Sequence, residues 1–160
     1  MSHFAELPDD TRLWIFQADR ELSSAEQSAV EESLESFLAG WNAHGKKLAA
    51  AAEVRYKRFL VIAADESKAA ASGCSIDDMF HHIRDLGAKI SIDFFDRTQL
   101  AYRLEGENTI HTVPLSEFSD RVASLGKENL TVFNNLIDKK KELDHHWETT
   151  IDTSWHAQLL

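Results

Sequence analysis

The single cysteine of the chain, Cys74, is the residue best suited by type and position to covalent chemistry. It follows a loop of small residues, and the sequence S-I-D-D that begins at Ser75 predicts the first turn of a helix. Because a helix N-terminus favours a thiolate, Cys74 is a candidate catalytic nucleophile, with His44, His111 or His156 as its base. The alternative is a structural thiol, buried at the junction of a strand and a helix. This second interpretation is the one that we favour.

A second candidate site is the stretch GWNAHGKK at residues 40–47, which resembles a phosphate-binding loop. It satisfies the pattern G-x-x-x-x-G-K-[ST] except at the last position, where Lys47 replaces the hydroxyl that would contact magnesium. A working phosphate loop follows a buried strand, whereas this stretch follows a predicted amphipathic helix, whose C-terminal end repels phosphate. We therefore expect no nucleotide here and assign Lys46 to the surface.

The eight histidines of the chain do not form a recognisable metal-binding pattern. The pairs His81–His82 and His145–His146 are adjacent, and adjacent side chains on a helix point about 100° apart. Asp78 and His82 are four residues apart and could share a metal ion, but no H-x-x-x-H or Cys/His zinc spacing occurs. We expect no metal and no cofactor.

Composition argues against several classes of function. The chain has 160 residues, 43% of them hydrophobic, which suits one domain over residues 1–160. Its formal net charge of −10 argues against a nucleic-acid partner, because binding a phosphate backbone requires a basic surface. No apolar run approaches the roughly 20 residues of a transmembrane helix, and the N-terminus lacks the apolar core of a signal peptide. One cysteine cannot form an internal disulfide. We therefore expect a cytoplasmic protein with no membrane partner.

The elements that must position these residues begin with three strands. Residues 11–17, TRLWIFQ, are rich in β-branched and aromatic side chains, and the apolar run at residues 59–64 predicts a central strand covered on both faces. Residues 48–56 are ambiguous, since their alanines favour a helix by propensity. We predict a strand, antiparallel to the central one, because Val54 and Tyr56 lead directly into it.

Two helices are predicted to cover these strands. Ser23 and Glu26 form a capping-box pattern ahead of a helix over residues 24–41, and a second helix runs from Ser75 to a stop at Gly87. The carboxylates of the first helix at positions 31, 32 and 35 are assigned to its solvent-exposed face. The apolar stripes of these strands and helices are expected to form one core, which includes Leu13, Ile15, Val30, Leu34, Phe37, Phe59, Val61, Phe80 and Ile83.

The second half of the chain alternates in the manner of antiparallel strands. We predict strands over residues 90–94, 100–104, 109–113 and 130–133, a short helix closed by Gly126, and a polar helix over residues 134–147. A tail at about 148–160 has no period but contains Trp155, so we expect it to wrap back on the domain. Together the elements predict an α+β fold, a single domain with a mainly antiparallel mixed sheet and helices packed against it.

The stretches RLWIFQADR, WNAHGKK, RYKRFLVIAAD, GCSID, VFNNL and SWHA resemble a family of short bacterial proteins, chiefly from Bacteroidetes. The family carries the automatic label "ABC transporter ATPase", and no activity or catalytic residue is established for it. The resemblance therefore implies a bacterial origin and assigns no role to any position here. The label itself does not fit, because an ABC ATPase requires a complete phosphate loop and an LSGGQ-like signature, which this chain lacks.

These observations favour a cytoplasmic, non-catalytic module that binds a small molecule or a protein partner, with a homodimer left open. The alternative is a small thiol-dependent enzyme that uses Cys74. Whether the protein is an enzyme stays undecided at this stage, although we lean against it and do not expect ATPase activity. A pocket beside the turn at Cys74 would favour the enzyme, and an exposed apolar patch would favour the interaction module.

Overall fold

The computed structural model describes residues 3–160, and the chain folds into two compact units. The first unit comprises the chain up to Asp96 together with Asp138–Lys140, and the second comprises Arg97–Ile137 and Lys141–Leu160. Helices and antiparallel strands occur in both units, so the predicted α+β class is confirmed. The assignment of one domain to residues 1–160 stays a prediction.

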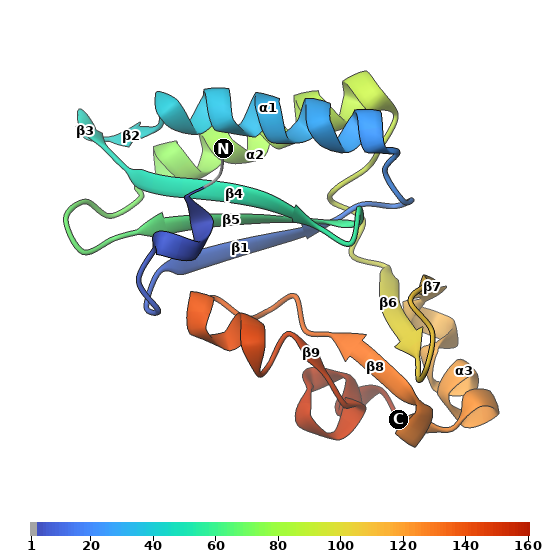
Figure 1. Ribbon diagram of the computed structural model, residues 1–160. Helices are drawn as coiled ribbons and strands as arrows, with labels where there is room; N and C mark the ends of the chain where they lie inside the picture. Colours follow the sequence, from blue (N-terminus) through green and yellow to red (C-terminus); the bar gives the residue numbers. More distant parts are fainter. Residues whose placement is uncertain (1–2) are drawn as a thin grey trace. The chain divides into compact units, whose positions relative to one another are not determined.

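The first unit is built on a three-stranded antiparallel sheet (Figure 1). Its strands are β1 (Arg12–Gln17), β4 (Ala49–Arg55) and β5 (Phe59–Asp65), in the order β1-β5-β4. Six consecutive residues of β5 are buried, as expected of an apolar strand that has neighbours on both edges. The central strand and the ambiguous alanine-rich strand were thus both predicted from the sequence.

Helices α1 (Ser24–Ala39) and α2 (Gly73–Ile90) lie on the same face of this sheet (Figure 1). The capping box of α1 forms as predicted: the Glu26 N–H donates to Ser23 Oγ over 3.1 Å, and the Ser23 N–H donates to the Glu26 carboxylate over 2.8 Å. The apolar side chains between the helices and the sheet form the core of the first unit, including Val30, Leu34, Leu60, Ile62, Met79 and Ile83.

The predicted core is wrong about which residues of the strands face the helices. Leu60 and Ile62 pack in the core beneath α1 and α2, together with Phe16 of β1. Phe59 and Val61 are completely buried, but they alternate with these residues and therefore point to the opposite face of the sheet. Because every residue of β5 up to Ala64 is apolar, the sequence does not distinguish its two faces.

The start and end of α2 also differ from the prediction. Ser72, rather than Ser75, is the N-cap: the Ser75 N–H donates to Ser72 Oγ over 3.1 Å, and the Ser72 N–H donates to Ser75 Oγ over 2.6 Å. The helix continues through Gly87 and ends at Ile90, and Ser91 follows in a left-handed conformation with a φ of 58°. A strand at residues 90–94 is therefore wrong, because this turn lies there.

The second unit contains a four-stranded antiparallel sheet and one α-helix. Its strands β6 (Gln99–Leu104), β7 (Ile110–Pro114), β8 (Leu130–Phe133) and β9 (Glu148–Thr149) have the order β7-β6-β8-β9. Helix α3 (Phe118–Leu125) contributes Phe118 and Val122 to a separate core, and residues of the tail complete that core. The tail residues in this core are Ile151, Trp155 and Leu159.

The predicted polar helix at residues 134–147 is wrong. This segment contains only a 3-10 turn at Lys140–Asp144, and it ends at Trp147, which is completely buried. The indole Nε1 of Trp147 donates to Asn135 Oδ1 over 2.9 Å. A buried tryptophan that needs both apolar cover and an acceptor thus determines the path of this segment, in which no helical period exists.

Candidate functional site

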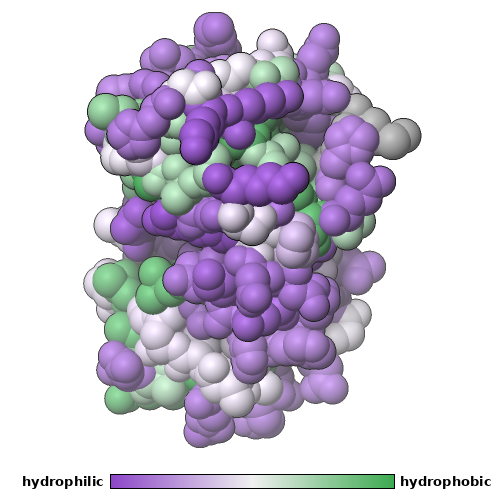
Figure 2. Space-filling model, turned by 90° about the vertical axis from the view of Figure 1, so that its left-hand side faces the viewer, coloured by the Kyte–Doolittle hydropathy of each residue, from purple (hydrophilic) through white to green (hydrophobic). Residues whose placement is uncertain are grey.

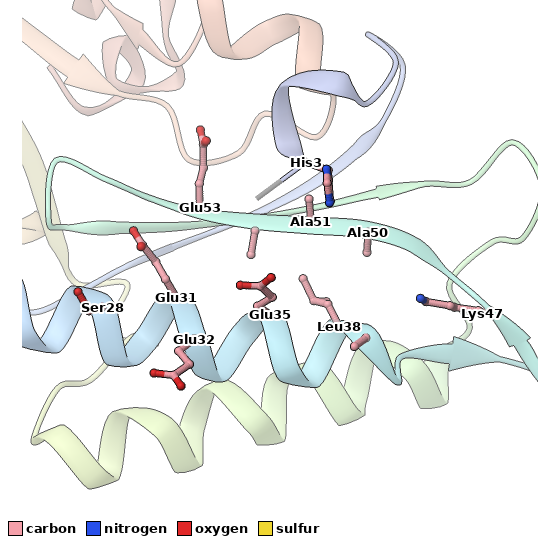
Figure 3. A pocket seen from close by; sticks show the side chains of 12 residues that line it. His3, Ser28, Glu31, Glu32, Glu35, Leu38, Lys47, Ala50, Ala51 and Glu53 are labelled. Carbon is pink, nitrogen blue, oxygen red and sulfur yellow. The ribbon is translucent and has the colours of Figure 1, made fainter. Parts of the chain in front are cut away.

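A groove with a volume of about 510 Å³ lies between α1 and β4 in the first unit (Figure 3). The groove is open to solvent along its length, and its lining is mostly small or acidic. It is lined by His3, Ser28, Glu31, Glu32, Glu35, Leu38, Ala39, Lys47, Ala50, Ala51, Ala52 and Glu53.

Strand β4 contributes four consecutive residues, Ala50–Glu53, to the lining of this groove. Successive side chains of a strand point to opposite faces of the sheet, so a groove that touches all four must run along the strand's edge. Strand β4 is indeed at the edge of its sheet: β5 pairs with it on one side, and no strand of the described chain pairs with it on the other. The groove therefore follows an open sheet edge.

Helix α1 forms the acidic wall of the groove. Ser28, Glu31, Glu35 and Leu38 recur at intervals of three and four residues, which places them on one side of the helix. Figure 3 shows Glu31 and Glu35 on the side of α1 that faces β4. These carboxylates are exposed, and Gln27 Nε2 donates to Glu31 Oε1 over 2.8 Å. The sequence analysis assigned them to a solvent-exposed face without recognising that this face borders a groove.

The charges that line the groove are predominantly negative. Four glutamates contribute to the lining, against a single lysine and one histidine. Glu53 is already paired with Arg55 Nε, its neighbour two positions along the strand. The other three glutamates lie on α1, and Figure 3 shows Glu31 and Glu35, but not Glu32, directed toward β4.

Small side chains explain why space is present here at all. Four of the seven residues of β4 are alanines, and three of these line the groove beside α1. An alanine does not extend far enough to fill the gap between a strand and a helix, whereas a leucine or phenylalanine would. The alanine run that made this segment ambiguous in the sequence is thus the direct cause of the groove.

Cys74 does not lie where the sequence analysis expected it. Its side chain is exposed rather than buried, and it occupies the second position of α2 rather than the residue before the helix. The favoured interpretation as a buried structural thiol is therefore wrong. The first turn of the helix had been misplaced by three residues, and this error also misplaced the thiol.

The histidines proposed as partners of Cys74 are distributed over both units of the described chain. His44 belongs to the same unit and lies in a hairpin turn. His111 and His156 belong to the second unit, where Nε2 of His111 lies 3.2 Å from Glu107 and Nδ1 of His156 lies 2.6 Å from Ser154 Oγ. The catalytic role of Cys74 stays a prediction, with no general base assigned to it.

The stretch that resembles a phosphate loop is a hairpin. Strands β2 (Asn42–Ala43) and β3 (Lys46–Lys47) pair through a two-residue turn, in which His44 and Gly45 have φ values of 51° and 78°. Positive φ at both central residues is the signature of a type I′ hairpin turn. Lys46 is exposed, as expected. The glycine and lysines thus have a structural explanation that requires no phosphate.

Two histidines are held neutral by burial. Burial lowers the pKa of His156 to about 4, and this ring stacks on Trp155 with centroids 4.1 Å apart. Burial likewise lowers the pKa of His82, which stacks on Phe37 and hydrogen bonds to Ser33 between α2 and α1. Both rings have structural partners, so neither provides an available catalytic base.

Among residues 3–160, no three His, Cys, Asp or Glu side chains converge in an arrangement that would hold a metal ion. Within the same range, no helix combines the length and apolar character needed to cross a bilayer.

Four large apolar side chains are exposed in the described part of the chain. They are Tyr56, Leu115, Leu136 and Leu160, which come from different elements. Hydrophilic side chains cover most of the face shown in Figure 2. The acidic groove between α1 and β4 is the candidate site that its lining residues define.

Comparison with known proteins adds no relative: no family model, curated protein or solved structure matches the chain. The resemblance to the short bacterial family therefore stays a prediction. Inference about function depends on the residues themselves.

Proposed function

We propose that the protein is a non-catalytic binding module whose ligand is positively charged and occupies the groove between α1 and β4. One observation carries this proposal: a groove of about 510 Å³ that is lined by four glutamates and by three alanines of an edge strand. Its volume lies within the range of roughly 300–1,000 Å³ that is usual for ligand sites. The negative lining matches a chain of formal net charge −10.

The lining suits a ligand with both methylene groups and a cationic end, such as a lysine or arginine side chain. Alanine methyl groups and Leu38 offer apolar contact to the aliphatic part. Glu31 and Glu35 then lie within the reach of an ammonium or guanidinium group. In this lining the only hydroxyl is that of Ser28, and the only histidine is His3, whose Nδ1 lies 3.3 Å from Glu6 Oε2. Binding without chemistry is the function that this set of side chains supports.

The test uses an acetylated and amidated hexapeptide of alternating lysine and valine, titrated against the full chain at low ionic strength by isothermal calorimetry. We expect saturable binding at one site. The double substitution Glu31→Lys/Glu35→Lys should weaken it by about tenfold or more, since two attractive charges become repulsive. The matched control is Asp78→Lys/Asp85→Lys, which makes the same change of charge on exposed positions of α2 outside the groove.

The control pair separates a site from the general attraction of a cation to an acidic protein. If both double variants weaken binding equally, the peptide responds only to net charge and the proposed site is wrong. The absence of saturable binding to the unsubstituted chain would overturn the proposal as well.

A further inference from the structure

The two edges of the sheet in the first unit differ in whether another segment of the chain pairs with them. At the β1 edge, Arg12 pairs with Lys139 in a β-bridge. Two backbone hydrogen bonds hold this segment, from the Leu13 N–H to Asp138 O over 2.9 Å and from the Lys140 N–H to Thr11 O over 2.8 Å. The β4 edge has no such cover among residues 3–160. The chain's own backbone therefore closes the β1 edge at its Arg12 end, whereas the β4 edge faces the groove.

Charged side chains protect the β4 edge only at Glu53 and Arg55, and the alanine run Ala49–Ala52 carries none. Proline, bulges and inward-pointing charges are the common devices. Strand β4 has no proline, and its register with β5 is unbroken over seven residues, from Ala49 opposite Asp65 to Arg55 opposite Phe59. Its outer N–H and C=O groups thus follow a regular spacing that another extended backbone could match.

The groove provides room for such a backbone. A strand that pairs with β4 would lie about 4.8 Å from it, in the space that Ala50–Glu53 border from both faces of the sheet. Side chains on one face of the added strand would point toward α1, where Glu31, Glu35 and Leu38 line the groove. Those on the other face would lie on the side of Glu53. Larger side chains in β4 would obstruct both faces, and alanines do not.

The negative charge of the groove lining determines which kind of strand would bind there. The glutamates of α1 favour a strand whose side chains on the α1 side are basic. A second copy of this chain is disfavoured, because it would bring a formal net charge of −10, and its own β4 edge lies beside the same glutamates. The two properties of the site, an unpaired strand edge and an acidic wall, together describe an extended basic peptide segment.

We propose that the protein binds an extended, basic segment of a partner protein by strand addition, in which the segment pairs with the outer edge of β4 and directs its lysine or arginine side chains toward Glu31 and Glu35. This proposal rests on the groove being the binding site, as proposed above. It adds a specific requirement: the partner's backbone, and not only its charge, is recognised.

The test compares the alternating lysine–valine hexapeptide with two N-methylated analogues. One analogue is methylated at the three lysine amides and the other at the three valine amides, so charge and sequence are unchanged. In a paired strand, alternate amides face the neighbour. We therefore expect one analogue to lose affinity by at least about tenfold, since up to three hydrogen bonds vanish, and the other to bind nearly as the parent does.

Hydrogen exchange provides a second, independent measurement on the full chain. When the parent peptide is bound, alternate amides of β4 should become protected, while spermine, a cation without a peptide backbone, should leave them unchanged. The substitution Glu31→Lys/Glu35→Lys should reduce this protection at a fixed peptide concentration, and Asp78→Lys/Asp85→Lys should not.

The outcomes distinguish this inference from the function on which it rests. Equal affinity of the parent and both analogues, with binding still weakened by Glu31→Lys/Glu35→Lys, would retain the groove as a cation site and exclude strand addition. If the parent peptide and both analogues bind with equal affinity, and Glu31→Lys/Glu35→Lys does not weaken that binding, both proposals are overturned. A dimer of the free protein that the peptide dissociates, detected by sedimentation, would assign the edge to a second copy and overturn the proposed partner.

Discussion

The indole Nε1 of Trp41 donates a buried hydrogen bond of 2.7 Å to the carbonyl oxygen of Ser75. Trp41 follows the C-terminus of α1, and Ser75 lies in the first turn of α2, so this bond joins the end of one helix to the start of the next. The ring is 3% exposed and packs edge-on against Trp14, with centroids 5.9 Å apart. It fixes the relative position of the two helices at one end of the first unit's core.

Removing the indole N–H of Trp41 should destabilise the protein even when an aromatic ring still occupies its position in the core. Trp41→Phe retains an aromatic ring but loses the hydrogen bond and part of the ring's volume, at a cost of about 1–3 kcal/mol in the free energy of unfolding. Trp14→Phe is the matched control, because the Trp14 ring is only partly buried. Urea denaturation of both variants provides the comparison. Equal losses would mean that the bond to Ser75 contributes nothing beyond ring burial.

Two glycines of α2 should respond in opposite ways to alanine. A Cβ atom at Gly87 would lie 2.4 Å from the carbonyl oxygen of Ile92 and 3.2 Å from the Phe94 ring. Gly87→Ala should therefore destabilise by about 1–3 kcal/mol, despite alanine's higher helix propensity. At Gly73 a Cβ atom meets nothing within 4 Å, so Gly73→Ala should be neutral or stabilising by up to about 1 kcal/mol. Thermal unfolding of the two variants would contradict this explanation if the signs were reversed.

Buried His156 should make stability fall below neutral pH. Its pKa is lowered from 6.5 in the unfolded chain to about 4 by burial. Above pH 6.5 the ring is neutral in both states and the stability is complete. As the pH falls from 6.5 to 4 the unfolded chain binds the proton first, so about 2–3 kcal/mol is lost progressively.

The measurement for His156 is the NMR titration of its ring Cε1 proton, with an expected midpoint near pH 4. The pH dependence of unfolding should also be flatter in His156→Gln than in the unsubstituted chain, since glutamine does not titrate. A ring that titrates near pH 6.5, or an unchanged slope in the variant, would show that burial does not hold this histidine neutral.

The hairpin at residues 42–47 should not bind nucleotide. Its two lysines form a strand that pairs antiparallel with Asn42–Ala43, whereas a phosphate loop curls its backbone N–H groups around the phosphates. Titration with ATP and magnesium should give no saturable signal, and Lys46→Ala should leave stability unchanged within about 0.5 kcal/mol, as is usual for an exposed position. Saturable binding abolished by Lys46→Ala would instead support the label carried by the resembling family.

The exposed thiol of Cys74 should react in the native protein. Iodoacetamide should alkylate it before unfolding, because exposure removes the steric barrier that protects a buried cysteine. The modified chain should retain its stability, since the side chain is exposed at the start of α2. Mass spectrometry under native and denaturing conditions gives the two rates. Full protection in the native state would mean that the thiol is covered in solution.

The sequence predicts an element correctly where its residue types or the period of its apolar side chains allow a single interpretation. The apolar run of β5 and the Ser23–Glu26 box of α1 are such cases, and both were predicted. The start of α2 was missed because a second serine, Ser75, occupies the position where a capping box usually has glutamate or glutamine. A hydroxyl accepts the same hydrogen bond, but it does not stand out in a sequence that contains many serines.

The groove could not be predicted from the sequence because it is a space between α1 and β4, two elements that are distant in the chain. Glu31 and Glu35 have the spacing of an ordinary solvent-exposed helix face, and the alanines of β4 have the composition of a helix. Only the placement of β4 at the sheet edge beside α1 brings these two features together. The period of apolar residues shows which face of a helix or strand is buried. It does not show which other element packs against that face.

The strand-like bridge between Arg12 and Lys139 has a consequence for synthesis of the protein. The first unit is discontinuous, because the segment that closes the β1 edge follows Asp96 by more than 40 residues. A nascent chain that has emerged only as far as Asp96 therefore carries a sheet with both outer edges bare. Completion of the first unit must wait until Lys140 leaves the ribosome, so until then the β1 edge is available to other strands in the cell.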